Sequence, residues 1–128
     1  MATPSDARWM GLLWSPLYPL TKAENFRASR EAGVYQLFDA SSSQLLYIGQ
    51  SSNLLSRLST HAISAIGGPP IVFTFSALPD VQLEHQLLEI ENDLIGGYYH
   101  LAKQPPGFQF AKTRLTAKVP RLPEEEEH

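Results

Sequence analysis

The sequence contains no cysteine and no long run of apolar residues. The absence of cysteine excludes a disulfide framework, a disulfide-linked partner, a thiolate zinc site and a cysteine nucleophile, and it fits the cytoplasmic location that we expect. The longest apolar-rich window, Trp9 to Leu20, is interrupted by Ser15, Pro16 and Pro19. A bilayer-spanning helix needs about 20 apolar residues, so we expect no membrane segment and no membrane partner. The window also lacks the basic start and small-residue cleavage site of a signal peptide.

Positive charge is also scarce. The chain has ten basic and thirteen acidic residues, and its formal net charge is −3. Four of the thirteen acidic residues form the run Glu124–Glu127, whereas the segment from Lys103 to Arg121 holds five basic residues and no acid. A basic segment in an acidic protein can still contact a phosphate backbone. From charge alone, a solvated C-terminal arm is the simpler interpretation of this segment.

A chain of 128 residues is expected to form one domain. Leu, Ile, Val and Phe together account for 34 residues, which is enough for a packed core. We expect an irregular lead-in over residues 1–20, the domain over 21–110, and a basic and then acidic tail over 111–128. The apolar residues of the lead-in are expected to pack onto the domain: Trp9, Leu12, Leu13 and Trp14.

Three stretches rich in β-forming residues predict strands over 34–38, 44–49 and 71–75, and a turn-rich loop between the first two indicates an antiparallel hairpin. The capping-box spacing of Thr21 and Glu24 predicts a helix over 22–32. Helical spacing of apolar residues predicts a second helix that ends near Ser64 and a third that opens at Asp80 with a broad apolar stripe. The predicted fold is therefore α+β, a small three-stranded mixed or antiparallel sheet flanked by helices.

Two short motifs lie in the predicted hairpin. Gly33-Val34-Tyr35 begins the first strand and Tyr47-Ile48-Gly49 ends the second, so the two tyrosines can approach each other. Arg57 follows eight residues after the second motif, and His61 lies one helical turn further on the same face. Glu91 lies in the third predicted helix, before Asn92-Asp93-Leu94-Ile95.

The ordered set of these residues resembles the GIY-YIG nuclease superfamily. The first motif is a conservative form of GIY, the second is YIG as written, and the match runs from Gly33 to Ile95. Gly33 and Gly49 are the glycines of the two motifs. Each motif alone occurs often by chance, whereas the ordered set is fairly specific. The resemblance implies a GIY-YIG-like fold and a divalent-metal-dependent endonuclease that hydrolyses DNA phosphodiester bonds.

The resemblance also implies a role for each matched residue. Glu91 would be an oxygen ligand for Mg²⁺ or Mn²⁺, and Arg57 would hold a phosphate oxygen. Tyr35 would act as the base, His61 would orient its phenol, and Tyr47 would orient water or phosphate. We expect all five side chains to line one concave surface.

DNA binding is expected to have little sequence preference because no separate reading element is present. The family often has an asparagine after the glutamate helix, and here no asparagine follows Asn92, so Gln109 is the candidate substitute. The candidate DNA contacts are Lys103, Gln109, Lys112, Arg114 and Lys118.

Two other interpretations stay open. A catalytically silent DNA-binding or scaffold module would keep the same fold, and an unrelated interaction domain would use an exposed Trp9–Leu20 segment. Taken singly, each tyrosine can be a packing residue, Arg57 a solvated residue and His61 an ordinary histidine. Glu91 is the most informative residue, because an unpaired carboxylate beside an apolar stripe is costly.

Overall fold

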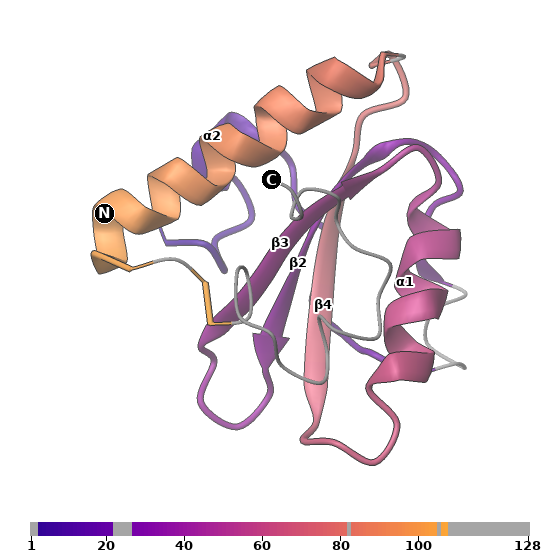
Figure 1. Cartoon of the computed structure of the whole chain (residues 1–128), viewed down its shortest axis with the longest axis vertical. Coiled ribbons are helices and arrows are strands. Elements are labelled where there is room, and N and C mark those ends of the chain that lie inside the picture. Colours follow the sequence, from indigo (N-terminus) through magenta and orange to yellow (C-terminus); the bar gives the residue numbers. More distant parts are fainter. Residues whose placement is uncertain (1–2, 22–26, 82, 105, 108–128) are drawn as a thin grey trace, which may run out of the picture.

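Three strands precede the first α-helix in the computed structural model, and a fourth strand separates it from the second (Figure 1). The structure describes residues 3–21, 27–81, 83–104, 106 and 107. None of the helices within these ranges is long and apolar enough to cross a membrane. The elements in chain order are a 3₁₀ turn η1 (Trp9–Gly11), β1 (Tyr18–Pro19), β2 (Gly33–Asp39), β3 (Leu45–Ser51), α1 (Leu54–Ser64), β4 (Ile71–Ala77) and α2 (Glu84–Ala102).

The described strands form one antiparallel sheet in the order β1-β4-β2-β3. The α+β class and the β2–β3 hairpin are confirmed, but the prediction of three strands is wrong because β1 adds a fourth. This strand pairs Tyr18 with Phe73 and Pro19 with Val72 at the edge of the sheet. Two residues are too few to show an alternating pattern, and proline is tolerated in a strand mainly at such an edge.

The two faces of the sheet carry separate hydrophobic clusters, and Figure 1 shows the two helices on opposite sides of the strands. The cluster on the α1 side contains Tyr35 and Leu37 of β2, whereas the cluster on the α2 side contains Val34 and Phe38. Successive side chains of a strand point to opposite faces, so β2 is buried on both sides. This strand therefore delivers Tyr35 to the α1 face of the sheet.

Helix α1 forms as its sequence predicts. The side chain of Asn53 accepts a hydrogen bond of 3.1 Å from the backbone N–H of Ser56, which caps the first turn. Leu54, Leu58 and Ala62 recur at helical spacing and are buried against the sheet.

Helix α2 differs from its prediction at both ends. It begins at Glu84 rather than at Asp80, and its N-cap Leu83 provides no side-chain hydrogen bond. It also continues through Gly96 and Gly97 to Ala102. Within the helix only Leu87 and Leu94 are buried, so the buried stripe is narrower than the sequence suggested.

Two predictions for the first third of the chain are also corrected. Of the helix expected over 22–32, residues 22–26 lie outside the described residues, and residues 27–32 form no α-helix. In the lead-in, Trp9 and Trp14 are buried as expected, but Leu13 is 67% exposed. Met10, Leu13 and Leu17 are the exposed large apolar residues of this segment, and its use as a protein-binding surface stays a prediction.

Candidate active site

Tyr35 and His61 form the centre of the candidate site. Tyr35 lies on β2 opposite Gly49 of β3, and its hydroxyl oxygen is 2.7 Å from His61 Nε2 on α1. Both side chains are almost fully buried, with exposed fractions of 0% and 1%. This hydrogen bond therefore joins the first glycine-tyrosine motif to the helix that follows the second motif.

Tyr47 completes a group of three rings. It pairs with Leu37 in the β2–β3 ladder, so it lies on the same face of the sheet as Tyr35 and diagonally across from it. Its ring centroid is 6.1 Å from that of Tyr35 and 5.4 Å from that of His61. The sequence-based expectation that the hairpin brings the two tyrosines together is confirmed.

The two motif glycines permit close approaches that any other residue would block. A side chain at Gly49 would collide with the phenol of Tyr35, which lies across this position of β3. A side chain at Gly33 would collide with the carbonyl oxygen of Ser76 and with Leu54. Neither glycine has a positive φ, so the backbone conformation does not require glycine there. Each is needed because a side chain would collide with its neighbours.

Arg57 and Glu91 bring opposite charges to this group. Arg57 lies one turn before His61 on α1, and Glu91 comes from α2; each side chain is partly exposed. Both charges act on the phenol of Tyr35, where Glu91 raises its pKa and Arg57 lowers it. The structure thus places all five predicted residues in one electrostatic neighbourhood. The three rings form its buried base, and the two charged side chains keep contact with solvent.

Burial shifts the protonation of all three titrating groups that interact with Arg57. It raises the pKa of Tyr35 well above its usual value, with the nearby Tyr47 acting in the same direction. It lowers the pKa of His61 to about 3, aided by the charge of Arg57. It raises the pKa of Glu91 to about 7, although Arg57 opposes this shift. At neutral pH the imidazole is therefore uncharged, and Glu91 is near the midpoint of its titration.

The direction of the hydrogen bond between His61 and Tyr35 depends on which nitrogen of the uncharged imidazole carries the proton. With the proton on Nδ1, His61 Nε2 accepts the hydrogen bond from the hydroxyl of Tyr35. With the proton on Nε2, the imidazole donates to the phenol oxygen. The Nδ1 atom is buried and has no hydrogen-bond partner among the described residues.

The remaining predicted contacts lie away from this centre or outside the described residues. Lys103 is exposed at the C-cap of α2, where its φ of 64° is left-handed. The other predicted DNA contacts lie outside the described residues: Gln109, Lys112, Arg114 and Lys118. No group of three or more potential metal ligands occurs among the described residues. Glu91 is the one carboxylate among the five candidate site residues.

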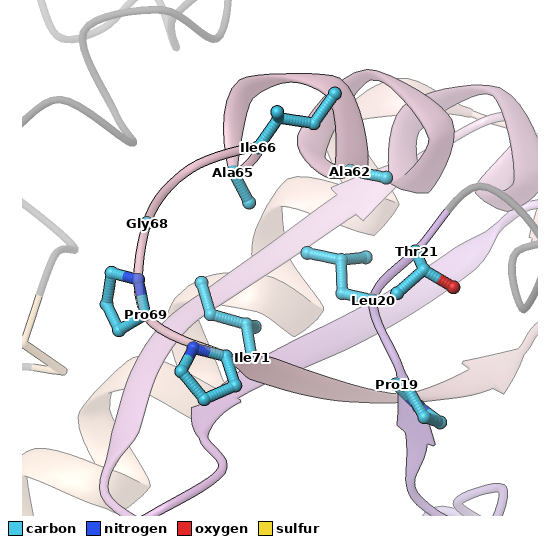
Figure 2. Close-up of a pocket in the computed structure, with 10 residues that line it drawn as sticks. Pro19, Leu20, Thr21, Ala62, Ala65, Ile66, Gly68, Pro69 and Ile71 are labelled. Atoms are coloured by element: carbon cyan, nitrogen blue, oxygen red, sulfur yellow. The ribbon is translucent and has the colours of Figure 1, made fainter.

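A pocket of about 430 Å³ lies at another place, between the end of α1 and the start of β4 (Figure 2). Its lining includes Leu20, Ala62, Ile66, Pro70 and Ile71, and it contains no charged side chain. None of the five candidate site residues lines it. It is therefore distinct from the Tyr35–His61 centre.

Comparison with known proteins adds no assignment. Neither a scan against protein-family models nor a search of curated proteins finds a match to this chain. The case for any function therefore depends on the residues and the geometry described above.

Proposed function

We propose that this chain is a GIY-YIG-type endonuclease that hydrolyses DNA phosphodiester bonds with a divalent cation, Mg²⁺ or Mn²⁺. The observation that carries the proposal is the 2.7 Å hydrogen bond between Tyr35 and His61. It joins two residues that are 26 positions apart and that the resemblance pairs by role. Arg57 and Glu91, the charged members of the same pattern, act on this phenol from two different helices.

Arg57 is suited to bind the scissile phosphate. Its guanidinium is planar and can hold two phosphate oxygens at once, and its side chain is only partly buried. Its charge also favours ionisation of the neighbouring Tyr35 phenol, and so lowers the pKa of that group against the effect of burial. Arg57 would therefore bind substrate and assist the proposed base.

Tyr35 is proposed as the base that accepts a proton from the attacking water. Burial raises the pKa of its phenol, so the hydroxyl is protonated in the free protein at neutral pH. In the tautomer with the imidazole proton on Nδ1, His61 Nε2 takes the proton of the Tyr35 hydroxyl while the phenol oxygen takes one from the water. The charge of Arg57 favours the phenolate character that develops on this oxygen during the transfer.

Glu91 would hold the cation. Hard divalent cations prefer oxygen ligands and keep several waters, so one carboxylate together with substrate phosphate forms a sufficient site. The partly exposed Glu91 fits this requirement, and its pKa of about 7 shows that its surroundings in the free protein leave its negative charge poorly compensated. When bound, the cation supplies charge stabilisation at the phosphate.

A DNA-binding or scaffold module without catalytic activity is the second candidate. Full burial of Tyr35 favours it, because a base must reach the water that it activates. In this alternative, the three rings serve only to pack α1 against the sheet, and Arg57 contacts the DNA backbone.

A plasmid-nicking assay separates these candidates. We expect the protein to convert supercoiled plasmid to nicked circles with Mg²⁺ and to stop when the cation is chelated. Glu91→Gln and Tyr35→Phe should each lower the cleavage rate by about 10²-fold or more, as loss of a positioned catalytic group does. The matched controls are Glu89→Gln and Tyr99→Phe, which alter exposed side chains of α2.

The outcomes are distinct. Cleavage by Glu91→Gln or Tyr35→Phe at the rate of the unaltered protein would contradict the assigned roles. A gel shift of the same DNA by the unaltered protein without any cleavage would support the second candidate instead.

A further inference from the structure

The segment Trp9–Leu20, here called the N-terminal strap, connects the sheet to the helix that carries Glu91. In Figure 1 its indigo trace runs beside α2 before it reaches the sheet. Trp9 and Trp14 are 2% and 7% exposed and belong to the same hydrophobic cluster as Leu94 of α2. A lead-in without structure would not bury two tryptophans in the core.

One end of the strap is fixed to β4. The backbone N–H of Ser15 donates to the carbonyl oxygen of Phe75 at 2.8 Å, and the N–H of Phe75 donates back to Ser15 Oγ at 3.1 Å. The hydroxyl of Thr74 donates to the carbonyl oxygen of Ser15. Strand β1 then pairs with β4, so this end cannot shift without breaking the edge of the sheet.

The other end is seated on α2. The indole N–H of Trp14 donates to the carbonyl oxygen of Trp9 at 2.9 Å, which closes the turn. Met10 has a φ of 58°, a conformation that residues with a Cβ seldom adopt. Its side chain lies so close to Gly97 that a Cβ there would be 2.8 Å from the sulfur and the terminal methyl group. The turn thus places the side chain of Met10 against Gly97 of α2, less than two helical turns after Glu91.

Helix α2 fully buries only Leu87 and Leu94 of its 19 residues. Its other apolar contacts, Ile90, Ile95 and Tyr98, are partly buried against the cluster that holds both tryptophans. The other four candidate site residues all belong to the continuous β2–β3–α1 unit, whereas Glu91 alone depends on where α2 lies. The position of Glu91 is therefore the part of the site that the strap can control.

We propose that the N-terminal strap sets the position of α2 over the sheet, and that Trp9 and Met10 are positioning residues for Glu91. The geometric part of this proposal stands by itself, and only its catalytic consequence rests on the proposed nuclease function. The two parts are tested by separate measurements.

The geometric test uses the full chain, which has no native cysteine. Spin labels on cysteines introduced at the exposed positions Ala40 and Glu89 report the distance between the sheet and α2 by pulsed electron paramagnetic resonance. We expect one narrow distance in the parent. It should shift or broaden in Trp9→Ala and Met10→Ala and stay unchanged in Leu13→Ala, a strap control that is 67% exposed.

Two variants protect this test against unfolding. Trp9→Phe keeps an aromatic ring at the site and should restore most of the parent distance, while Met10→Ala removes only a side chain that is 45% exposed. An unchanged distance in Met10→Ala overturns the proposal, whether or not Trp9→Ala folds. A changed distance in Leu13→Ala does so too.

The catalytic test compares kcat with KM in the nicking assay. Because Arg57 rather than Glu91 binds the phosphate, Met10→Ala should lower kcat about tenfold with little change in KM, as small misplacements of reacting groups do. A rise in KM as large as the fall in kcat would contradict the positioning role. An unchanged kcat would contradict it too. If no variant and no parent protein cleaves DNA, the proposed function fails while the distance measurement still decides the role of the strap.

Discussion

Gly49→Ala is expected to be among the most damaging single-methyl additions in this protein. The new Cβ would occupy the space of the Tyr35 phenol, closer than real Cβ atoms approach other atoms. The ring cannot simply turn away, because it is fully buried, contacts Tyr47 and hydrogen-bonds to His61 at 2.7 Å. Alanine is compatible with the backbone at this position, since Gly49 has no positive φ. The steric clash is therefore the cause of the expected damage.

The magnitude follows from two costs. Overpacking a filled core costs about 1–3 kcal/mol, and leaving a buried polar group without its hydrogen bond costs about 1–3 kcal/mol more. We therefore expect the free energy of unfolding to fall by about 2–6 kcal/mol, a large part of the 5–15 kcal/mol typical of a domain. Urea denaturation followed by circular dichroism measures this change.

The control is Gly96→Ala in α2, where nothing lies within 4 Å of an added Cβ. Alanine is the better helix former, so this variant should be about 0.5–1 kcal/mol more stable than the parent. Tyr35→Val should relieve the clash, so that the double variant loses less stability than the sum of the single variants. Loss of less than about 0.5 kcal/mol in Gly49→Ala, the range of neutral surface changes, would refute the packing argument.

Three further predictions concern pH and DNA binding. Because burial raises the pKa of Glu91 to about 7, the folded state holds this proton more tightly than the unfolded state, and stability should fall as pH rises from about 4.5 to about 7. Glu91→Gln should remove this component in urea titrations across that range, and an identical pH profile in the variant would contradict it. His61 has the opposite sign: its pKa of about 3 means that stability is lost as pH falls from about 6.5 toward 3, and His61→Gln should abolish that loss. DNA binding should be weak, should fall steeply between low and moderate salt, and should show little preference in competition with random duplex; strong retention of one short sequence at physiological salt would contradict this expectation.

The sequence alone determined those parts of the fold whose signals are local. The β-forming residues on either side of 39–44 are sufficient to define the β2–β3 hairpin, and Asn53 with the spacing of Leu54, Leu58 and Ala62 defines α1. The spacing of the two motifs also indicated which side chains would meet, because a hairpin has few possible registers and a helix brings residues four apart to one face.

Only the tertiary structure decided the features that depend on distant partners. Strand β1 exists because Tyr18 and Pro19 meet the edge of β4, and a two-residue strand carries no periodicity of its own. Helix α2 begins at Glu84 although Asp80 has the better capping side chain, so the presence of a capping residue did not locate the start of this helix. Full burial of Tyr35 and His61, and with it their shifted pKa values, results from the sheet and α1 closing over them. Burial depends on elements that are remote in the chain. The sequence pattern could therefore identify these residues as candidates, but it could not predict their protonation states.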